Sequence, residues 1–192
     1  MVTDLYRRIK RNIDEDGLIV SSSGFLVNRM LSQVDFSRPL KILEIGSGRG
    51  AFTREILRRM AAGSSLDVCE IKEEYNPCIE KLIAEHPEHH VRLHNQCVTR
   101  FLQDNRDFDV IISSLPLKNF ERMKDNNAFL DAVLTGFHNG LKEGGHYLQY
   151  QYFRSNLSDI ERTFGKTVDA VSFVPLNILP AFVYHMTKGQ VA

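Results

Sequence analysis

The residues best suited to chemistry in this sequence are three closely spaced glycines and two glutamates. Gly46, Gly48 and Gly50 directly follow an apolar run, and Glu44 precedes the first of them by two positions. A strand-to-helix turn rich in glycine lets the backbone approach a ligand closely. Glu70 ends the next apolar run, where a carboxylate can accept hydrogen bonds from ribose hydroxyls. The pattern therefore predicts a site for a cofactor that contains adenosine.

Two kinds of adenosine cofactor are compatible with the glycine spacing. Gly46, Gly48 and Ala51 satisfy the G-x-G-x-x-A pattern of nicotinamide sites. Against that assignment, Glu44 stands where dinucleotide folds usually have an apolar core residue, and the last helix is followed by two strands rather than by a further strand–helix unit. The run from Glu44 to Gly50, E-x-G-x-G-x-G, resembles motif I of the class I S-adenosylmethionine-dependent methyltransferases. This resemblance extends over nearly the whole chain from residue 40 onward.

The resemblance implies which residues bind S-adenosylmethionine. The acid before the glycines helps to place the methionyl end of the cofactor and the acid after the second strand holds the ribose, and Glu44 and Glu70 match these positions. The family often has Gly-Asp-Ala after the third strand, whereas this chain has Gln96-Cys97-Val98. Because a cysteine accepts hydrogen bonds poorly, adenine contacts are expected from the backbone of Cys97 and Val98. The complete predicted cofactor site is Glu44, Gly46, Ser47, Gly48, Gly50, Glu70, Ile71, Cys97, Val98 and Ser113.

The acceptor substrate is expected beside the loop that follows the fourth strand. Ligands of open α/β sheets lie at the carboxyl ends of the strands, and residues 113–120 occupy that place here. In enzymes that methylate the amines of nucleobases, the corresponding loop has the motif [Asn/Asp]-x-Pro-[Tyr/Phe], which this loop resembles. Ser114 stands in place of the amide or acid, and Leu117 in place of the aromatic ring that stacks on the base. The missing stacking platform disfavours a flat base as the substrate.

The acceptor loop and three further segments resemble bacterial phospholipid N-methyltransferases, which convert phosphatidylethanolamine to phosphatidylcholine. The loop string Ser-Leu-Pro-Leu-x-Asn-Phe at 114–120 is similar to theirs. Residues 17–26 resemble their Pro-Ser-Ser segment before motif I, and residues 177–184 resemble their closing Asn-Leu-Pro-Pro-Ala-x-Val-Tyr segment, each with one proline replaced. Residues 145–152 resemble their fifth strand. The four segments occur in the order and at the spacing of that family.

The resemblance implies methyl transfer to the amine of a lipid head group, with S-adenosylhomocysteine as the product of the cofactor. The amine attacks the sulfonium methyl in line, and the protein has to supply alignment and a neutral amine. An ethanolamine ammonium has no lone pair, so it must lose a proton before each transfer. Ser114, Tyr150, Tyr152 or water can relay that proton, and tyrosine rings can face a cationic amine. The predicted catalytic residues are Ser114, Pro116, Tyr150 and Tyr152, although half-buried strand positions would also explain both tyrosines.

The amino-terminal residues have the pattern of an interfacial helix. Apolar residues recur at helical spacing from Val2 to Ile13, and residues 1–13 contain four basic side chains against one acidic side chain. Such a helix binds anionic lipid, with each basic residue contributing on the order of 1 kcal/mol near the surface. Alternatively, the helix packs over the active site with its charges in solvent. The predicted membrane contact consists of Leu5, Arg7, Arg8, Ile9, Lys10 and Arg11.

The elements that have to position these residues alternate between strand and helix. The spacing predicts strands at 40–45, 66–71, 91–94, 109–113, 147–153, 168–174 and 181–187, and helices at 52–62, 76–86, 127–141 and 157–164, with Gly144 and Gly145 breaking the chain before the fifth strand. Such alternation predicts a Rossmann-like α/β fold of the class I methyltransferase type, with a seven-stranded, mostly parallel sheet, an antiparallel last strand and helices on both faces. Residues 1–38 are expected to form a helical extension, with two helices joined at 17–24, that covers the substrate or the membrane. Residues 39–192 are expected to form the methyltransferase domain.

The composition limits the other functional classes. The 24 basic and 24 acidic residues cancel and the pI is near 7.1, which disfavours a dedicated nucleic-acid binder. Three cysteines without a CxxC pair predict neither a disulfide framework nor a zinc site, and the histidines at 86–94 are assigned to a polar loop rather than to a metal. The cysteine usage indicates a reducing cytoplasm, and since no apolar run resembles a signal peptide or can span a bilayer, any membrane role is expected to be peripheral. Together with the family resemblance, this leads us to expect a monomeric, cytoplasmic protein associated with the inner face of the cell membrane. The alternatives are an rRNA adenine dimethyltransferase, a methyltransferase of another aminolipid or small amine, and a cofactor-binding module without turnover.

Overall fold

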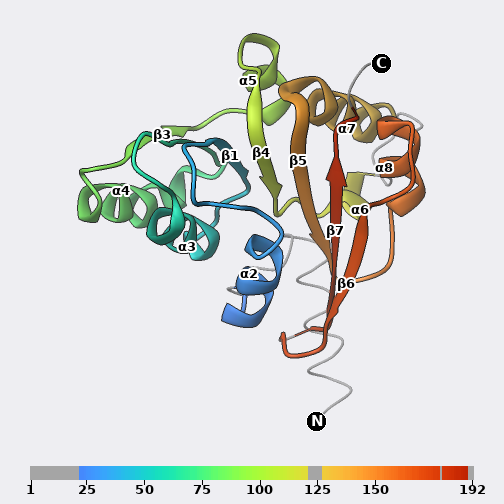
Figure 1. The fold of residues 1–192 in the computed structure, drawn as a ribbon, viewed down its shortest axis with the longest axis horizontal. Helices are drawn as coiled ribbons and strands as arrows, with labels where there is room; N and C mark the ends of the chain where they lie inside the picture. The colour runs from blue at the N-terminus through green and yellow to red at the C-terminus, as the bar shows by residue number, and fades with distance from the viewer. Residues whose placement is uncertain (1–21, 121–126, 178, 190–192) are drawn as a thin grey trace.

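A computed structural model describes residues 22–120, 127–177 and 179–189 of the chain. The strands of these residues form one seven-stranded sheet in the order β3-β2-β1-β4-β5-β7-β6 (Figure 1). Strands β1 to β5 pair in parallel, and β7 is antiparallel to both of its neighbours. The predicted sheet with its antiparallel last strand is confirmed. The strands are β1 (Lys41–Ile45), β2 (Ser65–Cys69), β3 (His90–His94), β4 (Phe108–Ser113), β5 (Leu141–Gln151), β6 (Ala170–Val174) and β7 (Ala181–Thr187).

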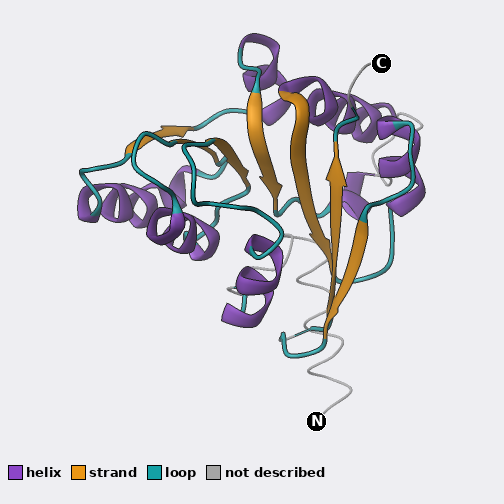
Figure 2. Ribbon diagram, in the orientation of Figure 1, coloured by secondary structure: helices purple, strands orange, loops and turns teal. Residues whose placement is uncertain are grey.

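Helices cover both faces of the sheet, and each face has its own apolar core (Figure 2). One core lies under α2 (Gly24–Leu31), α3 (Ala51–Arg59) and α4 (Asn76–Glu85), and the other under α5 (Val98–Asp104), α7 (Ala128–Gly140) and α8 (Leu157–Phe164). The short helices η1 (Glu73–Tyr75) and α6 (Leu117–Phe120) follow the ends of β2 and β4. Strand β4 is buried at all of its positions because alternate residues enter opposite cores, with Val110 and Ile112 in the first and Ile111 in the second.

The sequence pattern places Gly144 and Gly145 before the fifth strand, and this prediction is wrong, because both glycines lie within β5. The strand begins at Leu141, and its pairing with β4 shifts register between Phe108 and Val110. Gly144 has a φ of 74°, and a Cβ on Gly145 would lie 2.9 Å from the carbonyl of Phe108. The two glycines therefore allow a bulge and a close backbone approach within the strand, instead of ending it.

Three short helices, η1, α5 and α6, have no counterpart among the predicted elements. None exceeds two turns, which is too short for a recognisable apolar repeat. Of the two helices predicted within residues 1–38, the second corresponds to α2, which begins at Gly24 rather than after it. The first helix and the predicted membrane contact lie outside the described residues. No helix among the described residues has the length and apolar character needed to cross a membrane.

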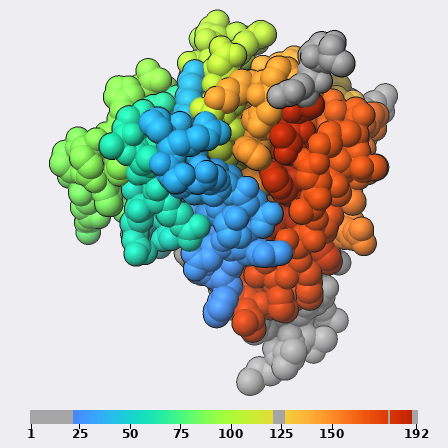
Figure 3. All heavy atoms as spheres, in the orientation of Figure 1, coloured from blue at the N-terminus to red at the C-terminus, as the bar shows by residue number. Residues whose placement is uncertain are grey.

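Helix α2 packs into the core beneath the sheet. Its residues Leu26, Met30 and Leu31 are fully buried. Ser23 caps the helix, because its hydroxyl oxygen accepts the N–H of Leu26 at 3.3 Å and satisfies one of the free donors of the first turn. Figure 3 shows the blue atoms of α2 against the orange segment that contains β6 and its connection to β7. The described part of the predicted extension therefore shares the core of the sheet.

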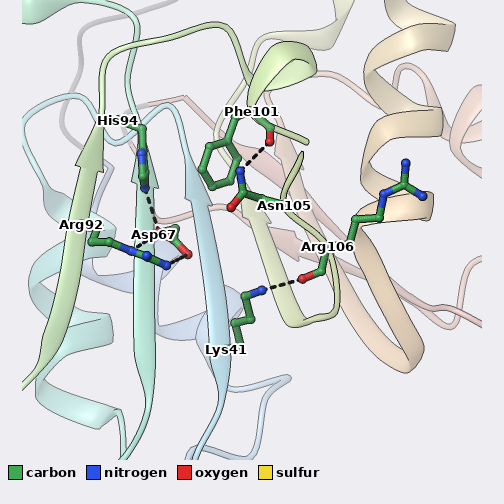
Figure 4. Close-up of polar contacts among 7 residues, drawn as sticks. All are labelled: Lys41, Asp67, Arg92, His94, Phe101, Asn105 and Arg106. Carbon is green, nitrogen blue, oxygen red and sulfur yellow. Dashed lines mark hydrogen bonds and ion pairs between the residues drawn. The ribbon is translucent and has the colours of Figure 1, made fainter. Parts of the chain in front are cut away.

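A charged cluster joins β2 to β3 near one edge of the sheet (Figure 4). The carboxylate of Asp67, which is 1% exposed, accepts a hydrogen bond from Arg92 Nε at 3.0 Å and lies 2.8 Å from His94 Nε2. The ring of His94 packs on Phe101 of α5, with 4.6 Å between the ring centroids. A buried carboxylate needs such partners, because an unpaired buried charge costs several kcal/mol. The cluster holds together the two strands whose carboxyl ends lead to Glu70 and to α5.

Candidate cofactor and acceptor site

The glycine turn between β1 and α3 leaves room for a ligand. Gly46, Gly48 and Gly50 have positive φ values of 73°, 51° and 81°, which residues with side chains rarely adopt. A Cβ on Gly50 would lie 2.5 Å from the Leu82 side chain, so this glycine allows α3 and α4 to pack together. A Cβ on Gly48 would meet no atom within 4 Å. The space beside Gly48 is therefore available to a bound molecule.

Glu70 joins the glycine turn to the turn that follows β2. Its Oε2 accepts the N–H of Gly48 at 2.8 Å, and its Oε1 accepts the N–H of Lys72 at 2.9 Å. A carboxylate offers about four acceptor positions, so two positions remain for ribose hydroxyls. The next residue, Ile71, is 67% exposed and offers an apolar surface to an adenine ring. Of the two predicted cofactor residues, Glu70 thus contacts the glycine turn, and Ile71 follows it at the end of the neighbouring strand β2.

Glu44 is a fully buried carboxyl group at the base of the glycine turn. Neither of its oxygens has a partner with full hydrogen-bond geometry among the described residues, and the same holds for the hydroxyls of Ser47 and Thr53. Burial raises the pKa of Glu44 to about 8, although the hydroxyl and amide of Thr53 favour the ionised form. The charge of Glu70 raises this pKa further. Because buried polar groups normally have well-formed hydrogen bonds, three groups around one turn that lack full hydrogen-bond geometry indicate a site that a polar ligand completes.

Cys97 and Val98 stand at the start of α5, after β3. The Cys97 Sγ lies 3.1 Å from the hydroxyl of Thr99, and the Val98 side chain is buried in the core beneath α5. The carbonyl of Cys97 accepts the N–H groups of Arg100 and Phe101. The adenine contact expected from these residues therefore depends on their backbone N–H groups, and it stays a prediction.

The loop after β4 lies directly against the glycine turn. The N–H of Ser114 donates to the carbonyl of Ile45 at 2.9 Å, and a Cβ on Gly46 would lie 3.4 Å from the Leu115 side chain. Ser113 is fully buried, and its Oγ accepts the N–H of Leu115 at 3.3 Å. The Ser114 hydroxyl is buried and has no hydrogen-bond partner among the described residues. The predicted acceptor loop and the predicted cofactor turn are thus in contact.

The acceptor loop continues into α6, and Leu117 points into the core. This side chain is fully buried with the residues of α7, so it offers no surface on which a base could stack. The ring of Phe120 already packs against another ring, because it lies edge-on to Phe129 with 5.0 Å between the centroids. The Lys118 ammonium lies 4.8 Å from the centre of the Phe153 ring. The residues of this loop that contact the glycine turn are therefore Ser114 and Leu115, and neither is aromatic.

Strand β5 directs the predicted tyrosines and two glutamines to opposite faces of the sheet. The amides of Gln149 and Gln151 both donate to the carbonyl of Leu115 at 3.1 Å. Tyr150 and Tyr152 pack against the other core, under α2 and α3. Among the described contacts, none joins Ser114 to either tyrosine. The structure therefore brings Ser114 to the glycine turn and gathers the two tyrosines in a separate cluster at the same edge.

The tyrosine cluster includes Phe52, which the sequence analysis did not single out. Tyr150 stacks on Phe52 with 6.0 Å between centroids, and Tyr152 packs edge-on against Tyr150 at 5.7 Å. The Ser22 hydroxyl donates to the Tyr150 hydroxyl at 3.4 Å. Burial raises the pKa of Tyr152, so its hydroxyl is protonated at neutral pH. The position of Phe52, two residues after Gly50, is the sequence signal that could have identified it.

Two segments that are distant in the sequence meet beside this cluster. The Ser23 N–H donates to Asn177 Oδ1 at 3.0 Å, and the Ser23 hydroxyl donates to the carbonyl of Leu176 at 3.1 Å. The Asn177 amide also donates to the carbonyl of Leu179 at 3.0 Å. Ser23 and Asn177 belong to segments 17–26 and 177–184 of the resemblance described above. The sequence alone does not indicate that these segments touch.

One compact group of possible metal ligands occurs among the described residues. The donor atoms of His86, Glu88 and His89 lie within 4.8 Å of one another, in the loop before β3. Both imidazoles approach the same oxygen of Glu88, at 3.2 and 3.5 Å. The backbone and His86 hydrogen bonds lower the pKa of Glu88. These contacts account for the group as a hydrogen-bonded loop, at the opposite end of the parallel strands from the glycine turn.

Comparison with solved structures identifies the fold as that of class I methyltransferases. An S-adenosylmethionine-dependent O-methyltransferase of Thermotoga maritima is 15% identical, with a TM-score of 0.66 over 100% of this chain and 72% of that chain. Precorrin-6y C5,15-methyltransferase of Geobacter metallireducens is 16% identical, with a TM-score of 0.67 over 92% of this chain and 97% of that chain. An rRNA methylase of Streptococcus thermophilus is 14% identical, with a TM-score of 0.59 over 85% of this chain and 94% of that chain.

Comparison of the sequence with family models and with curated proteins finds no match. Identities as low as those of the structural neighbours establish a shared fold and not a shared reaction. The predicted Rossmann-like methyltransferase fold is therefore confirmed.

Proposed function

We propose that this protein is an S-adenosylmethionine-dependent N-methyltransferase that acts at a membrane surface on the amine of a phospholipid head group, converting phosphatidylethanolamine towards phosphatidylcholine. The fold supports the methyltransferase part of the proposal, since its structural neighbours include several methyltransferases. The lipid part rests on segments 17–26, 114–120, 145–152 and 177–184, which resemble bacterial phospholipid N-methyltransferases.

The residues around the glycine turn fit S-adenosylmethionine. Glu44 offers a buried carboxyl whose oxygens have no partner with full hydrogen-bond geometry among the described residues, which suits the ammonium group of the methionyl part. Glu70 has acceptor positions for a ribose, and Ile71 exposes an apolar surface for an adenine. Gly48 leaves open space at the centre of the turn. When bound there, this cofactor supplies a methyl group on a positively charged sulfur.

The observation that carries the lipid assignment is the contact of Ser23 with Asn177 beside Tyr150 and Tyr152. Three of the four resembling segments meet at this point, although they are far apart in the sequence. The fourth segment, at 114–120, touches the glycine turn at the same edge of the sheet. Segments that a family shares because of its substrate are expected to gather around one site, so this arrangement supports a common substrate class.

In the proposed reaction, Ser114 and the tyrosines have separate tasks. The unpaired Ser114 hydroxyl can accept an N–H of the neutral amine and orient its lone pair. The rings of Phe52, Tyr150 and Tyr152 can attract the cationic head group through their π-faces. Since the raised pKa of Tyr152 keeps its hydroxyl protonated, this group is suited to relay a proton and not to hold a negative charge. The Ser22 hydroxyl, which lies 3.4 Å from the Tyr150 hydroxyl, can be a further group of this relay.

A second candidate function is methylation of rRNA, because an rRNA methylase is among the structural neighbours. Two observations make it the weaker candidate. Leu117, which stands where base-methylating enzymes have a stacking ring, is fully buried. The formal net charge of the chain is zero, whereas RNA-binding surfaces are usually basic.

The proposal is tested by methyl transfer from radiolabelled S-adenosylmethionine to vesicles of phosphatidylethanolamine and an anionic lipid, with thin-layer separation of the products. We expect label in mono-, di- or trimethylated lipid. A parallel reaction receives ribosomal RNA in place of the vesicles. Label in RNA and not in lipid would assign the second function, and absence of label from lipid despite measurable cofactor binding would contradict the lipid proposal.

A further inference from the structure

The carbonyl of Leu115, in the middle of the acceptor loop, receives three hydrogen bonds. Gln149 and Gln151 each donate an amide N–H to it at 3.1 Å, and the N–H of Leu117 donates to it at 2.9 Å. A carbonyl oxygen has two lone pairs, so this acceptor is saturated. By contrast, the hydroxyl of the adjacent Ser114 is buried and has no partner among the described residues.

The orientation of the Gln149 amide follows from its other partners. Its Nε2 also donates to the carbonyl of Tyr150 at 2.7 Å, and its Oε1 accepts the Tyr147 hydroxyl at 2.8 Å. Because carbonyls cannot donate, the nitrogen must be the atom that faces them. Gln149 is 0% exposed and Gln151 is 6% exposed, so both amides depend on protein partners. The period of two along β5 places both glutamines on the face that meets the acceptor loop.

We propose that Gln149 and Gln151 are positioning residues of the methyl-acceptor site, which occupy the Leu115 carbonyl and leave the Ser114 hydroxyl as the acceptor for the incoming amine. This inference rests on the proposed N-methyltransferase function and adds a reason for its substrate class. An aliphatic amine is already pyramidal, so one acceptor is sufficient to direct its lone pair toward the methyl group. An amine conjugated to a base is planar and needs two acceptors to expose its lone pair. Because the Leu115 carbonyl already accepts protein N–H groups and Ser114 offers one remaining acceptor, the loop favours an aliphatic amine.

The first test examines the hydrogen bonds without any methyl-acceptor substrate. Gln151→Met keeps the length of the side chain and removes the amide donor. We expect backbone amides of residues 113–120 to exchange hydrogen about fivefold faster or more in this variant, in the presence of S-adenosylhomocysteine. Exchange in the glycine turn and affinity for S-adenosylhomocysteine should change less than about twofold. Gln103→Met, at an exposed position of α5, is the control and should change neither. Unchanged exchange at 113–120 would overturn the proposal.

The second test asks whether Gln151 acts through Ser114. On phosphatidylethanolamine vesicles, Gln151→Met and Ser114→Ala should each lower kcat about tenfold, with KM changed less than about twofold. If Gln151 only positions the loop for Ser114, adding Gln151→Met to Ser114→Ala should lower kcat less than about twofold further. Fully additive losses would overturn the positioning role.

The two tests separate this inference from the proposed function. If the wild-type protein transfers no methyl group to the vesicles, the lipid function fails. Hydrogen exchange in the Gln151→Met variant then still decides whether the glutamines hold the acceptor loop.

Discussion

At the scale of single residues, the buried carboxyl of Glu44 makes the stability of the chain depend on pH. Its pKa is about 8 in the folded chain, against an ordinary value of 4.5. The folded chain therefore binds this proton more tightly than the unfolded chain, and the free energy of unfolding falls as pH rises from about 4.5 towards 8. Glu44→Gln removes the titration. We expect calorimetry to give similar melting temperatures for both proteins at about pH 5 and a higher one for the variant at about pH 9.

The same residue should release a proton when the cofactor binds. Pairing with the ammonium group of S-adenosylhomocysteine lowers the pKa of Glu44, so binding at about pH 7 should release close to one proton. Titration calorimetry in two buffers with different ionisation enthalpies measures this release. Glu44→Gln should bind about tenfold more weakly and release no proton. Equal proton release from the variant would assign the titration to another group.

At the scale of elements, Gly48 in the turn after β1 and Gly144 in β5 have the same backbone constraint, so their alanine variants can be compared. Both have positive φ values, of 51° and 74°, and at both a Cβ would meet no atom within 4 Å. Gly48→Ala and Gly144→Ala should each lower the free energy of unfolding by about 1–2 kcal/mol, because alanine is strained in this conformation. Only Gly48→Ala places a methyl group in the predicted cofactor space. Titration with S-adenosylhomocysteine should show about a tenfold or greater loss of affinity for Gly48→Ala alone, and an equal loss in both variants would contradict the site.

Glu70 connects two elements, because its carboxylate holds the turn after β1 to the turn after β2. Glu70→Ala should weaken cofactor binding by about 1–3 kcal/mol, since hydrogen bonds to the ribose and to the N–H of Gly48 are lost together. Calorimetric titration measures the change. Asp35→Ala removes another carboxylate that accepts a backbone N–H, that of Ser37, outside the site. It should leave the affinity unchanged, and wild-type affinity in Glu70→Ala would contradict the predicted ribose contact.

At the scale of the whole molecule, a formal net charge of zero conceals an uneven distribution along the chain. Residues 1–13 contain four basic side chains against one acidic side chain. They lie outside the described residues, so their membrane contact is a proposal. Replacing Arg7, Arg8, Lys10 and Arg11 by glutamine should lower the affinity for anionic vesicles about a hundredfold or more, since each basic residue contributes about 1 kcal/mol near such a surface. Vesicle flotation measures the bound fraction.

The control for that experiment removes the same amount of charge elsewhere. Arg54, Lys81, Arg100 and Arg106 are exposed and lie far from the amino-terminal segment in the sequence. Their replacement by glutamine gives the same net charge as the first variant. If both variants lose vesicle binding equally, the attraction comes from total charge and not from an amino-terminal helix.

The sequence by itself determined the principal strands and helices and the position of the glycine turn. Residues 157–164 were predicted as a helix and form α8, and the glycines at 46, 48 and 50 have the positive φ values that a tight turn requires. Apolar periodicity and glycine conformation are local properties, so a single sequence carries them. The prediction that Gly144 and Gly145 precede the fifth strand is wrong. A pair of glycines can end a strand or form a β-bulge within it, and the pairing with the neighbouring strand decides which of the two occurs.

Only the tertiary structure decided which distant residues meet. The contact of Ser23 with Asn177 and the stacking of Tyr150 on Phe52 depend on how α2, α3 and the β6–β7 connection pack around β5. The separation of Ser114 from the tyrosines, and the saturation of the Leu115 carbonyl, depend on the pairing of β4 with β5. These contacts arise from long-range packing of the sheet, which brings together side chains that no local pattern relates.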